Sequence, residues 1–488
     1  MIRLLIAVAL GIGLVSCTKD FEEINTNPNS PTEVPTAYLI TQAEFYLVDQ
    51  LLGQGVIGEI GQHYAQYLSQ NQYTSVTRYS TTNTSFYGLY RSGLQDLQFV
   101  IDQNTNEDTR DLVSPSGPNA NQIALATIMQ QWTFLNITDI WGDAPYTEAL
   151  QGTDNLFPIY DEQETIYRGA VQKLTEAGDM IVEGDVDGDI IFNGDMEKWR
   201  KFANSLILRA GLRVAKVDPS LGEEWTQLAL SRGVMTSNAD NAQVNYPGTG
   251  GQGNNSWYTN SLTRTDYVVS EPFIDYLQSF NDPRLMVYAD PTANSTAAGT
   301  PVYAGKPYGV TEDQAAETAT ADVSFPGLAA FYSATSPLTL LTYSEVLFNQ
   351  SEAAARGWTD EDAAELYRQA ITASMNQWGI TDESAISAYL DQEDVQYDPE
   401  NFEKSIGQQK WLALYWQGIE GWSEYRRLGY PELAPAPAAL NDSRQIPRRR
   451  AYPTDEFSLN QANYDAAIQR QFAGAGDSID GRVWWDVD

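Results

Sequence analysis

The amino-acid sequence predicts a mainly α-helical protein, in which helix pairs form a tetratricopeptide-like scaffold with long inserted loops and few short strands. Apolar residues recur at steps of three and four along several long segments, which is the spacing of an amphipathic helix. The clearest unit is a helix pair of about 40 residues with small residues at the expected contacts, as in tetratricopeptide repeats. Long segments without helical periodicity separate the pairs.

The N-terminus has the features of a secretory signal peptide over residues 1–16, since Arg3 is followed by an apolar run. Residues 14–17, Leu-Val-Ser-Cys, resemble a bacterial lipobox, in which cleavage precedes a cysteine that is then acylated. We therefore expect lipidation of Cys17 and a polar tether over residues 17–35. An ordinary signal peptide with a leftover cysteine is the alternative.

Residues 36–488 are expected to form a single helical domain. The first helix runs from Thr36 to about Leu52, and a last strong helix covers residues 403–428. Helix pairs are expected at 121–150 with 162–182, at 196–217 with 222–233, and within 337–378. In the last of these pairs, Pro337 opens the first helix, Gly357 ends it, and Thr359 with Asp362 forms a capping box.

Two loop-rich insertions, at about residues 69–86 and 238–336, are expected to face a ligand. Structureless segments of this length are uncommon unless they serve as binding surfaces. The second contains Gly248, Gly250 and Gly253 at the spacing of a dinucleotide-binding fingerprint. Because Pro247 precedes them and no helix start follows, we expect a flexible loop rather than a nucleotide site.

The charge balance narrows the classes of partner and of chemistry. There are 29 basic and 65 acidic residues, for a formal net charge of −36, so the protein repels nucleic acid and other polyanions. The only histidine is His63, which excludes multi-histidine zinc sites, and the only cysteine is Cys17, which excludes an intrachain disulfide. We expect His63 to be a hydrogen-bonded structural residue.

The insertions also carry the side chains that we expect to bind ligand. A sugar ring has an apolar face that stacks on an aromatic ring, while its hydroxyls pair with amides and charged groups. The predicted ligand-binding residues are aromatic, apart from one amide: Trp257, Tyr258, Tyr73, Tyr79, Tyr267, Tyr308 and Asn255. For any single ring, packing beneath its loop is the competing interpretation.

A calcium loop is a weak alternative at one acidic turn. Asp185, Asp187 and Asp189 resemble the start of such a loop, but Ile190 stands where it needs Gly and Met196 where it needs Glu. We therefore expect an acidic surface turn, with a structural calcium as the lesser possibility and no other cofactor.

No residue is identified as catalytic. Glu420 and Glu424 share a helix face, as the paired carboxylates of a glycosidase could, but Glu424 lies three residues before Arg427, which is ion-pair spacing. We expect structural pairing. The basic cluster of Arg444 and residues 448–450 is likewise expected to form internal ion pairs, with a partner-docking patch as the alternative.

Taken together, these segments resemble the SusD/RagB family over nearly the whole mature chain. The resemblance rests on the lipobox, the Asn-Pro-Asn leader at 27–29, Trp-Gly-Asp-Ala-Pro-Tyr-Thr-Glu-Ala at 141–149, and the helix segments at 343–346 and 352–354. It rests also on the segments at 408–415 and 420–427, on Ile-Pro-Arg-Arg at 446–449 with Tyr-Pro at 452–453, and on Trp-Trp-Asp at 484–486. The resemblance implies a surface lipoprotein of Bacteroidetes with a tetratricopeptide-like scaffold and inserted loops.

The same resemblance implies a non-enzymatic role in nutrient binding at the cell outer membrane, facing the exterior. Members of the family form a lid on a SusC-like TonB-dependent transporter and capture oligosaccharides or, in the RagB branch, peptides. Because the chain is so acidic, a neutral glycan is favoured over an anionic one. A RagB-like peptide binder is the main alternative. A glycan-degrading hydrolase and a purely structural surface protein are the others.

Overall fold

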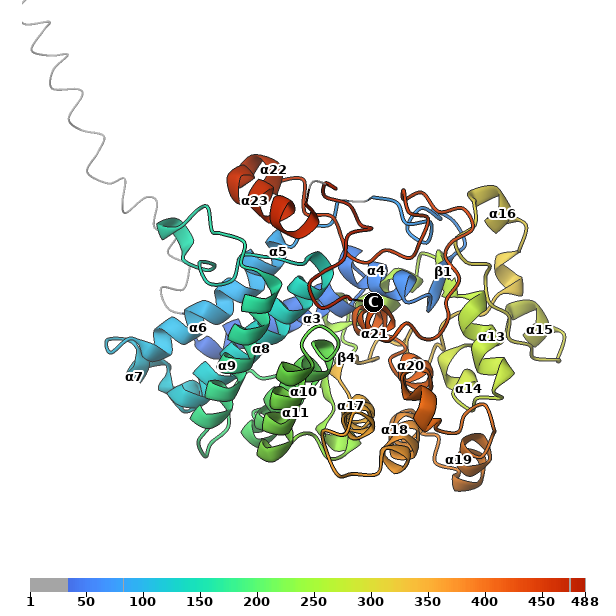
Figure 1. The fold of residues 1–488 in the computed structure, drawn as a ribbon, viewed down its shortest axis with the longest axis horizontal. Helices are drawn as coiled ribbons and strands as arrows, with labels where there is room; N and C mark the ends of the chain where they lie inside the picture. The colour runs from blue at the N-terminus through green and yellow to red at the C-terminus, as the bar shows by residue number, and fades with distance from the viewer. Residues whose placement is uncertain (1–33, 82, 474, 488) are drawn as a thin grey trace, which may run out of the picture.

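The computed structural model describes residues 34–81, 83–473 and 475–487, and these are mostly helical (Figure 1). Cys17 and the tether up to residue 33 lie outside the described residues. Four long helices confirm the first two predicted pairs: α8 (Asn119–Trp141) with α9 (Gln163–Met180), and α10 (Met196–Arg213) with α11 (Pro219–Arg232). The predicted class, a helix-pair scaffold with few short strands, is confirmed.

The scaffold is a continuous series of packed helices. Helix α3 (Thr36–Leu52) packs on α6 (Gln95–Thr105), and α6 packs on α8. The series continues through α9 and α10 to α17 (Tyr343–Ala355), which packs on α18 (Ala363–Gln377). In Figure 1 these helices occupy the left and lower parts of the molecule, whereas α13 to α16 (within residues 271–316) lie at the right and α22 and α23 (within residues 456–472) at the top.

The pair expected at 337–378 is present, but its N-terminal boundary and its cap differ from the prediction. Residues Leu338–Leu341 form strand β4, and α17 begins after Thr342, whose hydroxyl accepts a hydrogen bond from the Glu345 backbone N–H. Helix α18 is capped by Asp362 alone, without the expected capping box. Strand pairing therefore overrides the helical periodicity that the Leu residues suggested.

The predicted helix at 403–428 is two helices, α20 (Phe402–Ala413) and α21 (Gly418–Leu428). The break falls at Trp416, which has a positive φ of 76° that no helical residue adopts. The apolar pattern runs across the break because both helices bury side chains in the same core.

The remaining elements are short. The two sheets are antiparallel and two-stranded: β1 (Leu68–Gln70) pairs with β3 (Tyr267–Val269), and β2 (Ala242–Val244) with β4. Both predicted loop-rich insertions contain such short elements. The other helices are α4 (Val56–Tyr64), α5 (Tyr87–Leu89), α7 (Arg110–Val113), α12 (Ser256–Ser261), α13 (Glu271–Ser279), α14 (Leu285–Tyr288), α15 (Ala293–Ala297), α16 (Glu312–Ala316), α19 (Glu383–Leu390), α22 (Glu456–Leu459) and α23 (Gln461–Phe472), with a π-helical turn, η1, at Tyr90–Leu94 and 3₁₀ turns at Ser114–Ser116, Gly152–Asp154, Asn238–Asp240, Gly251–Gly253, Thr320–Asp322 and Pro399–Asn401.

Helices α4 and α21 approach each other through glycines. A Cβ placed on Gly61 would lie 2.5 Å from the Ile419 backbone nitrogen, and one on Gly418 would lie 2.3 Å from the Gln62 nitrogen. Only glycine allows backbones to meet this closely. The contact joins the first loop-bearing segment to the C-terminal part of the scaffold.

A network of buried ion pairs fills the interior between α10, α17, α20 and α21. Glu424 lies 2.7 Å from Arg213, 2.6 Å from Lys410 and 2.7 Å from Arg427. Burial alone would raise the pKa of Glu424, but these three cations outweigh it and hold that pKa well below the usual range. The expected Glu424–Arg427 pair is thus present, within a larger network.

Within the described residues, no helix is long and apolar enough to cross a membrane.

Candidate functional site

Two of the predicted ligand-binding residues, Trp257 and Asn255, lie in the core. Trp257 is 1% exposed, its indole N–H donates to the Leu52 carbonyl at 3.1 Å, and its ring packs on Trp416. Asn255 is fully buried, where its side chain caps α12 and donates to the Ser336 carbonyl at 2.9 Å. The expectation that they face a ligand is therefore wrong, because both are fully used in holding the loop onto the scaffold.

Tyr79 and Tyr308 are also internal, against the prediction. The hydroxyl of Tyr79 accepts a hydrogen bond from the Ala436 N–H at 2.9 Å, and that of Tyr308 donates to the His63 carbonyl at 2.7 Å. Both rings are buried, and their centroids lie 6.4 Å apart in a tilted arrangement. Each fastens a loop by a hydrogen bond between residues distant in sequence, which periodicity cannot reveal.

The exposed predicted aromatic is Tyr73, whose side chain is 60% exposed. The Arg264 guanidinium lies over its ring at 5.4 Å from the centroid, in cation–π geometry. Arg264 is held in turn by Asp266, which also accepts a hydrogen bond from Gln72. We call the surface formed by Tyr73, Arg264 and Tyr267 the aromatic platform.

Tyr267 joins the platform to the helix beneath it. It lies on β3 opposite Gln70 of β1, half-buried, and its hydroxyl accepts a hydrogen bond from the Gln54 amide at 3.2 Å. The same hydroxyl contacts Glu59 of α4, where burial raises the pKa of that carboxyl to about 7. Tyr258, the remaining predicted aromatic, is half-buried on α12.

A pocket of about 500 Å³ adjoins the platform and is lined largely by amides. We call it the amide pocket. Gln54 belongs to both, and the Arg264 N–H donates to the Asn260 carbonyl at 3.0 Å. The side chains of Gln50, Gln252 and Asn260 make no hydrogen bond to other described residues. Its lining residues are Phe45, Tyr46, Asp49, Gln50, Gln54, Gly251, Gln252, Asn254, Ser256, Thr259 and Asn260.

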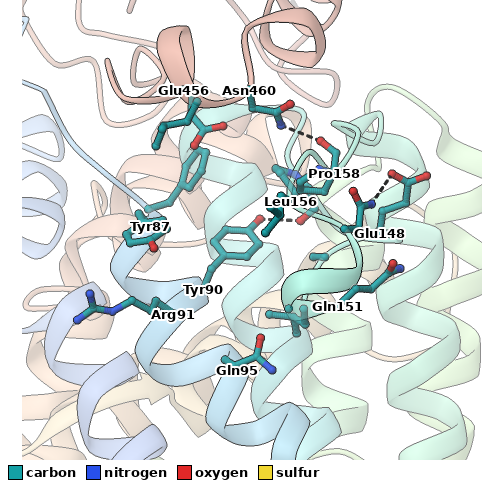
Figure 2. Close-up of a pocket in the computed structure, with 17 residues that line it drawn as sticks. Tyr87, Tyr90, Arg91, Gln95, Glu148, Gln151, Leu156, Pro158, Glu456 and Asn460 are labelled. Carbon is teal, nitrogen blue, oxygen red and sulfur yellow. Dashed lines mark hydrogen bonds between the residues drawn. The ribbon is translucent and has the colours of Figure 1, made fainter. Parts of the chain in front are cut away.

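A second cavity, of about 320 Å³, lies between α5, the loop after α8 and α22, and we call it the tyrosine pocket (Figure 2). Figure 2 shows Tyr87 and Tyr90 from the chain after the first insertion facing the loop that carries Leu156 and Pro158. Glu456 and Asn460 border it from the C-terminal region. The sequence analysis did not identify this pocket, because its walls come from three distant segments.

In the acidic turn, the third aspartate, Asp189, stabilises the fold. Asp189 is buried, and its two carboxylate oxygens accept hydrogen bonds from the Ile191, Phe192 and Gly194 N–H groups and from the Trp199 indole. Asp185 and Asp187 are exposed. The carboxylate of Asp189 is therefore occupied by protein donors, which corrects its place among the candidate calcium ligands. Among the described residues, no group of three or more His, Cys, Asp or Glu is placed to hold a metal ion.

Most of the other candidate side chains are held in internal ion pairs or hydrogen bonds. Glu420 pairs with Arg213 at 2.6 Å, so neither it nor Glu424 is free to act as an acid or base on a ligand. Arg448 and Arg449 pair with Asp486 and Asp477, while Arg444 is exposed. His63 is fully buried, which lowers its pKa to about 4, and its Nδ1 lies 2.7 Å from the Glu59 carbonyl oxygen.

Comparisons with known proteins agree with this architecture. The chain is similar to a chitin-binding protein of known structure, with 27% identity, a TM-score of 0.79, and 93% of this chain and 100% of that chain covered. It is similar to a SusD homologue from Bacteroides fragilis, with 25% identity, a TM-score of 0.79 and the same coverage. A chitin-binding SusD homologue from Flavobacterium johnsoniae, 24% identical with a TM-score of 0.75, shares the fold over 93% of this chain and 96% of its own.

A comparison with curated protein sequences returned no match. The decisive match is to a sequence family. The model of a SusD-like family described as starch-binding and associating with the outer membrane matches residues 28–453. This span includes the helix-pair scaffold and both insertions, and it supports a glycan-binding role at the outer membrane. The chain belongs to the SusD-like family.

Proposed function

We propose that the protein captures neutral oligosaccharides on the aromatic platform and in the adjoining amide pocket. The observation that carries the proposal is the exposed Tyr73 ring beside a 500 Å³ pocket in which Gln50, Gln252 and Asn260 have free hydrogen-bonding groups. The ring offers a flat apolar surface for one face of a sugar, and the amides offer donors and acceptors for hydroxyls. Tyr267 is part of the platform, and Tyr258 lies on α12, the helix whose Ser256, Thr259 and Asn260 line the pocket.

The choice of a neutral glycan follows from charge. The formal net charge of −36 repels anionic sugars at long range, and Asp49 lies in the pocket wall. Arg264 is already paired with Asp266, so it does not offer an open anion site. Similarity to the chitin-binding protein makes β-linked N-acetylglucosamine oligomers the first ligands to test.

The proposal includes delivery and anchoring. A chain acylated at Cys17 would stay at the outer membrane, capture a glycan and pass it to a SusC-like TonB-dependent transporter. The family description, which names association with the outer membrane, supports this part. Cys17→Ser should move the protein from the membrane fraction to the soluble fraction of cells. Unchanged fractionation would argue against the lipid anchor.

Calorimetric titration of a panel of neutral oligosaccharides tests the binding site. Tyr73→Ala should weaken binding about fivefold, since a ring contact contributes about 1 kcal/mol. Phe99→Ala is the matched control, because Phe99 is also exposed, at 45%, but lies on α6 away from the platform. Equal binding by both variants would contradict the proposed site.

Two further outcomes would contradict the function itself. Sustained release of reducing ends from a polysaccharide would show hydrolysis, which the ion-paired Glu420 and Glu424 do not support. Selective binding of peptides over every glycan in the panel would show a peptide-capturing role instead.

A further inference from the structure

The tyrosine pocket has the construction of a preformed ligand site. Three hydrogen bonds join the three segments that form its walls. Tyr90 donates to the Pro145 carbonyl at 2.6 Å, Asn460 donates to the Pro158 carbonyl at 2.8 Å, and the Tyr160 hydroxyl donates to Glu456 at 2.6 Å. Within the loop after α8, Glu148 accepts hydrogen bonds from the Asn155 amide and the Ile159 N–H at 3.0 and 3.2 Å. A ligand would therefore enter a shape that already exists, with little ordering cost.

Most of the surface that lines this pocket is formed by apolar atoms. Rings come from Phe86, Tyr87 and Tyr90, and proline and aliphatic side chains face them. At the rim, Tyr87, Leu156 and Leu459 are 54%, 66% and 59% exposed. Large apolar side chains gathered around one cavity mark a binding site rather than ordinary surface.

Only a few polar groups in the pocket remain available to a ligand. The hydroxyl of Tyr87, the amides of Gln95 and Gln151 and the exposed guanidinium of Arg91 make no hydrogen bond to other described residues, and they border the cavity (Figure 2). The carboxyl groups of Glu148 and Glu456 also line the wall and outnumber this single cation, so the lining disfavours an anionic ligand. The pocket thus suits a neutral ligand that has an apolar group and a small number of hydrogen-bonding groups.

We propose that the tyrosine pocket is a second glycan site, selective for a sugar bearing an acetamido group. A sugar with hydroxyls on every carbon would place several of them against Leu and Pro side chains without partners, which is costly. An acetamido methyl instead fills apolar space, while its amide and the ring hydroxyls reach Gln95 and Gln151. This inference rests on the proposed glycan-binding function and adds a site that shares no lining residue with the amide pocket.

The test uses saturation-transfer NMR with the trisaccharide of β-1,4-linked N-acetylglucosamine, on the full mature chain carrying Tyr73→Ala so that the platform contributes little. The acetamido methyl protons should receive the strongest saturation. Adding Tyr87→Ala or Leu156→Glu should weaken that signal, since the affinity should fall about fivefold, the scale of one lost ring contact. Leu112→Glu, on an equally exposed leucine of α7, should change neither.

The glucose trisaccharide with the same linkage is the matched ligand. It should bind this pocket more weakly, and Leu156→Glu should not alter its binding. Methyl saturation that is unchanged in both pocket variants, or equal losses for the two trisaccharides, would overturn the inference. Loss of glycan binding through Tyr73→Ala in the otherwise unchanged chain tests the proposed function separately, so the two can fail independently.

Discussion

In the helix-pair interior, Glu424 is contacted by Arg213, Lys410 and Arg427, whereas at the surface the amides of Gln50 and Gln252 make no hydrogen bond to other described residues. Both regions contain polar side chains next to aromatic rings. In the interior the charged groups of the network are paired with one another and excluded from water, so they hold helices in register. On the surface they are free and close to an exposed ring, so they can recognise a ligand. Whether a polar side chain is already paired within the protein, more than its residue type, distinguishes the scaffold from the candidate site.

The largest effect should come from breaking the interior network. Arg427→Met removes the cation that buried Glu352 and Glu424 share, which lies 2.6 Å from Glu352 and 2.7 Å from Glu424. We expect a loss of about 4 kcal/mol in the free energy of unfolding, measured by urea denaturation. Arg168→Met, which removes an exposed pair with Glu164, is the control and should cost under about 1 kcal/mol. Similar losses in the two variants would refute the distinction drawn here.

The next largest effect concerns Trp257 and Tyr73, two aromatic residues that both belong to the predicted ligand-binding set. Trp257→Ala should destabilise the fold by about 3 kcal/mol, because it empties a core site and removes the hydrogen bond to Leu52. Tyr73→Ala should leave the thermal unfolding midpoint nearly unchanged and act on glycan affinity alone. If Trp257→Ala proved as stable as the parent chain and lost glycan binding, Trp257 would be a ligand residue after all.

The free energy of unfolding should depend on pH through Glu59, which lies at the base of the platform. Because burial raises the pKa of Glu59 to about 7, the folded chain keeps this proton between pH 4.5 and 7 while the unfolded chain releases it. Its contribution to stability is therefore full below pH 4.5 and is lost as pH rises to 7, at up to about 1.4 kcal/mol per unit. Glu59→Gln should remove this component. Unfolding curves of the two chains that stay parallel across that range would contradict it.

The smallest effect concerns a single hydrogen bond. Tyr79→Phe removes the acceptor for the Ala436 N–H and should cost about 1 kcal/mol in unfolding free energy. Glycan affinity should not change, because the Tyr79 ring is buried. A clear loss of affinity in a stable variant would return Tyr79 to the ligand surface.

The sequence was sufficient for the helix pairs but not for the loops. Apolar spacing located α9 to α11 and α18 within a few residues, because a helix buries one face along its whole length, whereas α8 ends at Trp141 and not at the predicted residue 150. It could not show that Leu338–Leu341 pair with a strand about 95 residues earlier in the chain, or that Trp416 breaks the last helix. Both depend on contacts between distant segments.

The same limit applies to the site. Composition correctly directed attention to aromatic residues in the insertions, but exposure separates Tyr73 from Trp257 and Tyr79, and exposure is set by the fold. Trp257 is buried, and its indole N–H donates a hydrogen bond to the carbonyl of Leu52, 205 residues away in sequence. The tyrosine pocket could not have been found, since Tyr87, Leu156 and Glu456 meet only in space.

The glycine contact between α4 and α21 has a mechanical consequence. At Gly61 and Gly418 two backbones meet with no side chain between them, so there is no flexible group to absorb a displacement. Glu59, beneath the platform, lies two residues from Gly61, and Glu420 of the ion-pair network lies two residues from Gly418. The base of the platform and the ion-pair network are therefore joined through direct backbone contact, and a side chain added at Gly61 or Gly418 would force the two apart.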